Sequence, residues 1–331
     1  MSIVYLNGAY LPAEEATIPV NDRGFLFSDG IYEVTPAYRG HLFGFEAHRA
    51  RLLRGRCELR LEGEAGDLAA VHRELLRRNG LEDAPVSIVY LQITRGVAPR
   101  THAFPKERVP LTVYAYAREF VRPPRERWND GFRAVTVPDR RWARVDIKTV
   151  SLLGNVLAQQ AAVDAGVDDA ILVRDGVALE GAHSNFFGVF DGTVVTHGES
   201  NVILPGITRG VVLELARELE IPVREAPIQV EELARAPALR GLPEAGPGPH
   251  RTSPCCRLTP PGTAGDRVTG RRSRGCGAPR CAARGPSPGR PGGPGRPWIR
   301  RGSCGPGRRS VEQVLLRRGP KGPPRFRPAP L

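Results

Sequence analysis

The chain has 331 residues and a formal net charge of +13, yet residues 1–235 hold 28 basic and 32 acidic residues, whereas residues 236–331 hold 20 basic and three acidic residues. The mildly acidic body gives no electrostatic reason to expect a nucleic-acid partner, so the charge of the whole chain is misleading. No run of eighteen apolar residues and no basic leader with an apolar stretch is present, so we expect a cytoplasmic protein without a membrane partner.

Residues 1–121 are expected to form a small α+β domain. Strands are predicted around the Asn7-Gly8 turn, at 3–6 and 9–11, because Asn-Gly is a strong hairpin signal. Further strands are predicted at 30–38, 86–94 and 111–116, which are rich in β-branched and aromatic residues. Apolar residues at helical spacing predict helices over 48–61 and 68–78.

Residues 122–235 are expected to form a larger second domain after an Arg-Pro-Pro linker at 122–124. A strand is predicted at 132–137, followed by a helix over 152–165 that Ser151 can cap. Asp175-Gly176 and Asp191-Gly192 each lie between apolar runs and predict two hairpins. A last helix begins at 206–208 and ends before Ile221-Pro222.

Residues 236–331 have a different composition. They contain 19 Pro and 18 Gly, so they cannot build a core and predict a disordered basic tail. Excess Arg, Gly and Pro is also what a GC-rich gene yields when it is translated out of frame, and the coding DNA would test this explanation. Five cysteines lie in the tail without the paired spacing of a zinc site, so no metal is expected.

Lys148 is one of only three lysines in the chain, beside 45 arginines. It lies in an apolar context, between Ile147 and Val150. Lysine supplies a primary amine that can lose its proton and attack a carbonyl carbon, which arginine cannot do. The segment therefore suggests Schiff-base chemistry, although a lysine at a strand end that extends to water would fit the local pattern alone.

Six stretches in order carry a wider resemblance: 22–34 (DRGFLFSDGIYEV), 48–51 (HRAR), 92–102 (QITRGVAPRTH), 144–155 around Lys148, 179–186 (LEGAHSNF) and 203–209 (ILPGITR). Together they resemble the class IV pyridoxal-phosphate aminotransferases, and among these the D-amino acid aminotransferases. The resemblance covers residues 1–235. It implies an α+β, two-domain, fold-type IV enzyme with the cofactor between the domains, the second domain being the one that binds pyridoxal phosphate.

The resemblance also implies the cofactor-binding residues. Lys148 would form the internal aldimine and carry the proton between the substrate Cα and the cofactor. Glu180 would pair with the ring nitrogen and keep it protonated. Arg51, together with Ile207 and Thr208 at the start of a helix, would hold the phosphate through a guanidinium, backbone N–H groups and a hydroxyl.

The substrate class depends on Tyr32, Arg100 and His102, which match residues that bind the substrate α-carboxylate in D-amino acid enzymes. The family places the Arg and His on a loop of the partner subunit, so the resemblance implies a homodimer. Substrates would be a D-amino acid such as D-alanine and a 2-oxo acid such as 2-oxoglutarate. Ala182 and His183 replace the small, hydroxyl-rich residues expected there, and His183 is expected to narrow the pocket.

Other functions remain open. A branched-chain aminotransferase or an aminodeoxychorismate lyase of the same fold is the first alternative. A non-catalytic remnant is the second, because the family continues after residue 235 with strands and a hydroxyl-bearing loop that have no counterpart here, which implies a truncated second domain. A polyanion-binding role for the tail is the third, but aromatic residues between its arginines are few.

Overall fold

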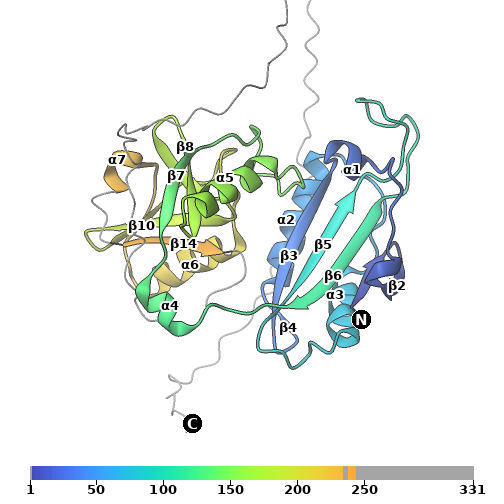
Figure 1. Cartoon of the computed structure of the whole chain (residues 1–331), viewed down its shortest axis with the longest axis horizontal. Coiled ribbons are helices and arrows are strands. Elements are labelled where there is room, and N and C mark those ends of the chain that lie inside the picture. Colours follow the sequence, from blue (N-terminus) through green and yellow to red (C-terminus); the bar gives the residue numbers. More distant parts are fainter. Residues whose placement is uncertain (1, 234–237, 244–331) are drawn as a thin grey trace, which may run out of the picture. The chain divides into compact units, whose positions relative to one another are not determined.

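The computed structural model of the chain describes residues 2–233 and 238–243. Its strands form two sheets, the first from the blue to cyan part of the chain and the second from the green to orange part (Figure 1). In these residues no helix is long and apolar enough to cross a membrane. The same part of the chain contains no group of His, Cys, Asp or Glu side chains arranged to hold a metal ion.

The first sheet is antiparallel, with the strand order β2-β1-β6-β5-β3-β4. Its strands are β1 (Ile3–Leu6), β2 (Ala9–Pro12), β3 (Gly30–Tyr38), β4 (His41–Leu42), β5 (Ser87–Thr94) and β6 (Thr112–Glu119). The hairpin predicted at Asn7-Gly8 is confirmed, and both of these residues have positive φ angles, as a type I′ turn requires. A 3-10 turn, Ala13–Glu15, and the short helix α1 (Arg23–Phe27) connect β2 to β3.

Helices α2 (Phe45–Glu58) and α3 (Leu68–Arg78) pack on one face of the first sheet (Figure 1). Leu52 of α2 and Leu75 of α3 join alternate residues of the strands in one buried cluster. The predicted helix over 68–78 is confirmed, and α2 begins three residues before the predicted residue 48. The burial of these apolar faces fixes which face of β3 is turned away from the core.

The other face of the first sheet carries a row of tyrosines. The ring of Tyr32 on β3 stacks on Tyr90 of β5, with 5.6 Å between ring centroids, and Tyr90 stacks on Tyr116 of β6 at 5.1 Å. Aromatic pairs at these separations add stability beyond the area they bury. The row holds Tyr32 against a rigid neighbour.

The second sheet is mixed, with the order β12-β11-β10-β9-β8-β7, while β13 pairs with β9 and β14 with β10. Its strands are β7 (Ala134–Pro138), β8 (Asp169–Arg174), β9 (Val177–Gly181), β10 (Ser184–Phe190), β11 (Thr193–Thr196), β12 (Val223–Glu225), β13 (Ile228–Gln229) and β14 (Ala238–Pro243). Both predicted hairpins are confirmed, since Asp175, Gly176, Asp191 and Gly192 all have positive φ angles.

Four helices accompany the second sheet: α4 (Arg125–Asp130), α5 (Leu153–Asp164), α6 (Ile207–Glu218) and α7 (Val230–Leu233). The prediction that Ser151 caps α5 is wrong, because the N-cap is Leu152 and no side chain caps it. Figure 1 shows α5 beside β7 and β8. The division of the body at residue 121 stays a prediction, although β6 ends at Glu119 and β7 begins at Ala134.

The sequence predicts no strand beyond residue 236, whereas the structure has β14 at Ala238–Pro243, paired antiparallel with β10 from Val189 to Ser184. Residues 238–243 (ALRGLP) do not alternate apolar and polar residues, so the sequence alone does not identify this strand. The predictions of disorder, frame change and cysteine chemistry for the rest of the tail lie outside the described residues.

Candidate active site

A cavity of about 290 Å³ is lined by three of the residues singled out in the sequence, Tyr32, Lys148 and Glu180. Its walls come from β3, from the segment between β7 and α5, from the first turns of α5, from the β9–β10 connection and from Leu204. His183, which the sequence suggests could narrow the pocket, also lines this cavity. Residues from five separate stretches of the chain thus meet at one place.

Lys148 is buried, with 6% of its surface exposed, although lysine is rarely buried. Its carbonyl oxygen accepts a 3.0 Å hydrogen bond from the backbone N–H of Tyr32, and Thr149 forms a bridge to Ile31. The Nζ atom lies 4.3 Å from the centroid of the Tyr32 ring, within the range of a cation–π contact. The backbone of β3 therefore fixes the position of Lys148.

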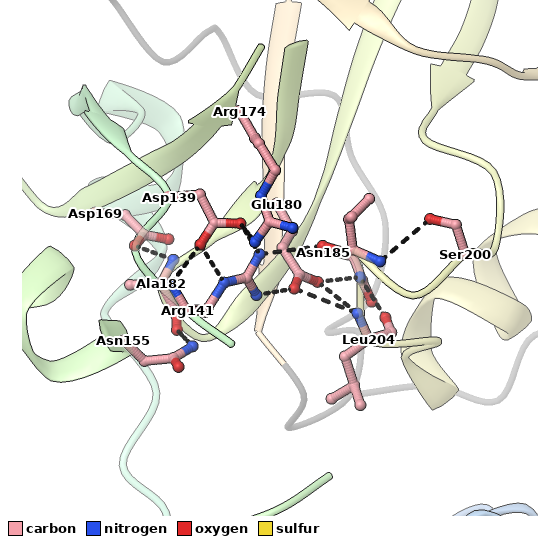
Figure 2. Close-up of polar contacts among 11 residues, drawn as sticks. Asp139, Arg141, Asn155, Asp169, Arg174, Glu180, Ala182, Asn185, Ser200 and Leu204 are labelled. Carbon is pink, nitrogen blue, oxygen red and sulfur yellow. Dashed lines mark hydrogen bonds and ion pairs between the residues drawn. The ribbon is translucent and has the colours of Figure 1, made fainter. Parts of the chain in front are cut away.

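Glu180 lies near the end of β9, opposite Asn185 in the register of the β9–β10 hairpin, and is 4% exposed. Asn185 Nδ2 donates to Oε2 at 3.0 Å, and the backbone N–H of Leu204 donates to the same oxygen at 3.1 Å. Arg141 NH1 donates to Oε1 (Figure 2). Three donors from different segments hold this carboxylate in one orientation.

Arg141 is itself bound by Asp139 at the end of β7. Its Nε donates to Oδ1 at 2.9 Å and its NH2 to Oδ2 at 3.1 Å, a bidentate pair. Burial alone would raise the pKa of Asp139, but the hydrogen bonds and charge of Arg141 lower it. Burial would lower the pKa of Arg141, whereas Asp139 and Glu180 raise it. Both groups therefore stay charged.

Arg51 on α2 is buried beside Glu33 of β3. Its Nε and NH2 donate to the two oxygens of Glu33, each at 2.8 Å, and His48 Nδ1 lies 2.8 Å from Glu33 Oε2. Burial alone would raise the pKa of Glu33, but the charge of Arg51 and the hydrogen bonds lower it to about 2. Glu33 is thus an anion that orients the guanidinium of Arg51.

The third guanidinium nitrogen of Arg51, NH1, lies at the start of α6. NH1 donates to the carbonyl oxygen of Pro205 at 3.0 Å, and Pro205 directly precedes Gly206, the N-cap of α6. Gly206 provides no side-chain cap, and Ile207 and Thr208 form the first turn. A guanidinium beside the N-terminus of a twelve-residue helix has the charge and the backbone donors that a phosphate group needs.

Gly206 and Asn185 fit together closely. A Cβ atom at residue 206 would overlap Oδ1 of Asn185. Asn185 also donates to the carbonyl oxygen of Leu204 at 2.8 Å, so its amide connects the Glu180 carboxylate to the segment that leads into α6. Glycine at 206 is required by this close approach rather than by its backbone angles, which are extended.

Arg100 and His102 do not line the cavity. Both are exposed on the loop after β5, where the Arg100 guanidinium lies 5.3 Å from the centroid of the Phe27 ring and the His102 ring centroid lies 5.6 Å from it. Arg23 NH1 donates to the carbonyl oxygen of Thr101 at 2.7 Å. The structure thus orders this loop but leaves its two predicted site residues away from Lys148 and Glu180.

Five residues that bind or orient groups of the site are not among those singled out in the sequence: Glu33, His48, Asp139, Arg141 and Asn185. Glu33 gave a usable signal, because an acidic residue in a strand of β-branched and aromatic residues needs a buried cation. Asn185 lay inside one of the six matched stretches. Arg141 gave none, since the run 139–144 (DRRWAR) has the composition of an exposed loop.

Comparison with known proteins identifies the family of this chain. The sequence model of the family "Amino-transferase class IV" matches residues 30–240. The D-alanine aminotransferase of Staphylococcus haemolyticus is 41% identical over 238 residues, which cover 71% of this chain and 83% of that protein. The D-alanine aminotransferase of Bacillus licheniformis is 38% identical over 236 residues, 70% of this chain and 81% of that protein.

Solved structures give the same fold. The branched-chain aminotransferase of Thermoproteus uzoniensis has a TM-score of 0.67 and 26% identity, covering 78% of this chain and 87% of that one. The fold IV transaminase of Curtobacterium pusillum has a TM-score of 0.60 and 26% identity, covering 72% of this chain and 83% of that one. The predicted α+β, two-domain, fold-type IV class is confirmed by these neighbours.

Proposed function

The chain belongs to the class IV aminotransferase family, and we propose that it transfers the amino group of a D-amino acid, such as D-alanine, to a 2-oxo acid such as 2-oxoglutarate. The observation that supports this most strongly is the convergence of Tyr32, Lys148 and Glu180 on one cavity, in a chain about 40% identical to D-alanine aminotransferases. Class IV aminotransferases use pyridoxal 5′-phosphate, so the chain is a pyridoxal-phosphate-dependent enzyme.

The donor set of this structure fits that cofactor. Arg51 with Ile207 and Thr208 at the start of α6 would hold the phosphate, and Glu180 would face the ring nitrogen. When bound, the cofactor supplies an electrophilic carbon for the substrate amine and a ring that stabilises negative charge at the substrate Cα. Glu180 would keep the ring nitrogen protonated, which strengthens that stabilisation.

Lys148 is proposed as the catalytic base. Its Nζ would accept the proton from the substrate Cα and return it on the cofactor side, a transfer that needs a buried amine held in one place. The backbone bond from Tyr32 to Lys148 and the ring contact at Nζ provide that constraint. A Lys148→Ala variant is expected to lose activity altogether.

Arg100 and His102 are proposed to bind the substrate carboxylate together with Tyr32, but in the cavity of a second copy. The supporting observation is that the ordered loop keeps both away from the cavity of their own chain. Arginine binds a carboxylate through two parallel hydrogen bonds, which explains the choice of residue. The active form would then be a homodimer with C2 symmetry.

Mixing two inactive variants tests this arrangement. In a heterodimer of one Lys148→Ala subunit and one Arg100→Ala subunit, one of the two sites has both Lys148 and the partner's Arg100. Random re-association makes half of the dimers heterodimers, so it should restore roughly a quarter of the wild-type activity. Absence of recovery after exchange of subunits, checked by co-purification of differently tagged variants, would show that Arg100 does not act across the dimer.

Solved structures with this fold include branched-chain aminotransferases, which is the observation behind the branched-chain alternative. These enzymes are less identical to the chain than the D-alanine aminotransferases are. Steady-state pyruvate formation from D-alanine and 2-oxoglutarate, compared with transfer from L-leucine and pyruvate release from aminodeoxychorismate, separates the alternatives. We expect the highest kcat/KM with D-alanine. Transfer from L-leucine but from no D-amino acid would defeat the proposal.

A further inference from the structure

A row of alternating charges lies behind Glu180 (Figure 2). Arg174 on β8 donates to Asp139 Oδ2 at 2.8 Å, Asp139 binds Arg141 through both oxygens, and Arg141 NH1 donates to Glu180. None of the roles proposed above for the cavity residues requires a buried carboxylate at Asp139. The row therefore needs an explanation of its own.

The inner three side chains of the row are buried. Counting side-chain atoms alone, the exposed fraction is 0% for Asp139, 3% for Arg141 and 5% for Glu180, whereas it is 27% for Arg174. Charges in a dry interior interact strongly, and an uncompensated one is unfavourable. Two carboxylates, Asp139 and Glu180, thus bind one buried guanidinium, whose single positive charge balances only one of their two negative charges.

Arg141 differs from the other groups that bind Glu180. Asn185 and the backbone N–H of Leu204 are neutral donors, so they orient the carboxylate without changing the local charge. Arg141 also orients the Glu180 carboxylate, but its positive charge would disfavour protonation of a cofactor ring nitrogen that pairs with Glu180. The negative charge of Asp139, which binds Arg141 through both of its oxygens, offsets the positive charge of Arg141.

We propose that Arg141 is a positioning residue that orients Glu180, and that Asp139 cancels the charge of Arg141 so that Glu180 presents net negative charge to the ring nitrogen of the cofactor. The inference rests on the proposed function, because it requires pyridoxal 5′-phosphate in the cavity. Asp139 acts through Arg141 and Glu180 and does not line the cavity.

Gly154 in the first turn of α5 supports the positioning role. A Cβ atom there would lie 2.9 Å from Cγ of Arg141 and 3.2 Å from its Cα and backbone nitrogen. The φ angle of Gly154 is not in the left-handed region, so the backbone does not require glycine, and alanine is the better helix former. The absence of a side chain at 154 leaves the room that Arg141 occupies.

Asp139→Asn removes the compensating charge and keeps the shape of the side chain. The full chain is loaded with cofactor labelled with ¹⁵N at the ring nitrogen, whose chemical shift reports protonation, and the Kd for pyridoxal 5′-phosphate is measured by equilibrium dialysis. We expect the protonated fraction to fall and the Kd to rise about tenfold. Asp168→Asn is the matched control, because Asp168 pairs with Arg127 in the same sheet region away from Glu180.

Gly154→Ala keeps every charge and displaces Arg141, so it should raise the Kd about threefold or more. It decides the matter if Asp139→Asn gives no cooperative thermal transition. A ring-nitrogen shift and Kd in Asp139→Asn equal to those of Asp168→Asn, or an unchanged Kd in Gly154→Ala, would overturn the inference. Failure of the proposed function would instead appear in the unsubstituted chain, as cofactor binding without amino transfer from D-alanine.

Discussion

Two buried arginine–carboxylate clusters of this protein differ in the number of carboxylates that bind the arginine. In the Glu33 cluster (Glu33, His48 and Arg51), one carboxylate binds one guanidinium, whose third nitrogen reaches the start of α6. In the Glu180 cluster (Asp139, Arg141 and Glu180), two carboxylates share one guanidinium. Under the proposed function, the first cluster would face an anionic phosphate and the second a cationic ring nitrogen. In the first cluster the single guanidinium is matched by one carboxylate, whereas the buried side chains of the second include one more carboxylate than guanidinium.

Among changes to the two clusters, the largest effect is expected from removing the anion of the Glu180 cluster. Glu180→Gln keeps a group that can accept a hydrogen bond but cannot stabilise a protonated ring nitrogen, so kcat should fall by roughly 10²- to 10³-fold. Steady-state amino transfer measures the loss. The melting temperature of the apoprotein serves as the control for folding, and a kcat within tenfold of wild type would contradict the assigned charge.

The Glu33 cluster should contribute to stability in a pH-dependent way. The pKa of Glu33 falls from 4.5 to about 2 on folding, so its contribution, about 3 kcal/mol, is fully present above pH 4.5 and is lost as the pH falls towards 2. Glu33→Gln should flatten the pH dependence of the free energy of unfolding in that window. Urea titrations of both proteins between pH 5 and about 2.5 provide the measurement; identical slopes would contradict the account.

Gly206 connects the two clusters, because it packs against Asn185 and begins α6. Gly206→Ala should lower the free energy of unfolding by about 1–3 kcal/mol, since the new Cβ atom displaces the Asn185 amide. Gly210→Ala in the same helix is the matched control: no atom lies within 4 Å of the added Cβ, and stability should rise by about 1 kcal/mol. Equal effects in the two variants would remove the packing argument.

The smallest effect is expected where an arginine–carboxylate pair is exposed. Arg108 and Glu62 form a 2.7 Å pair, but their side chains are 68% and 69% exposed. Water and salt screen such a pair, so Glu62→Gln should leave the Tm and the cofactor Kd unchanged. A clear loss of stability would mean that burial does not distinguish the two clusters from a surface ion pair.

Local signals predicted most of the elements. Asn7-Gly8, Asp175-Gly176 and Asp191-Gly192 each determine their turn through residues that tolerate positive φ, which is why all three hairpins are where the sequence predicts them. Helix α3 follows from apolar spacing. The short elements α1, β12, β13 and β14 could not be predicted, since their identity depends on partners distant in the sequence.

The site divides in the same way. Lys148 could be recognised from the sequence because it is one of only three lysines and lies among apolar residues, whereas Glu180 was identified only through the family resemblance. Asp139 and Arg141 could not, because only the folded chain shows that they lie behind Glu180 rather than in water. Arg51 was predicted as a phosphate ligand, but its dependence on Glu33 and His48 required the pairing of β3 with α2.

The central claim is that this cavity carries amino transfer from a D-amino acid with Lys148 as the base. A single-turnover experiment tests it most directly: full-length protein loaded with pyridoxal 5′-phosphate is mixed with D-alanine or L-leucine, and the visible absorbance of the cofactor is followed as it converts to pyridoxamine 5′-phosphate. The account predicts rapid loss of that absorbance with D-alanine, little change with L-leucine, and none with Lys148→Ala. Faster conversion with L-leucine than with D-alanine would contradict it.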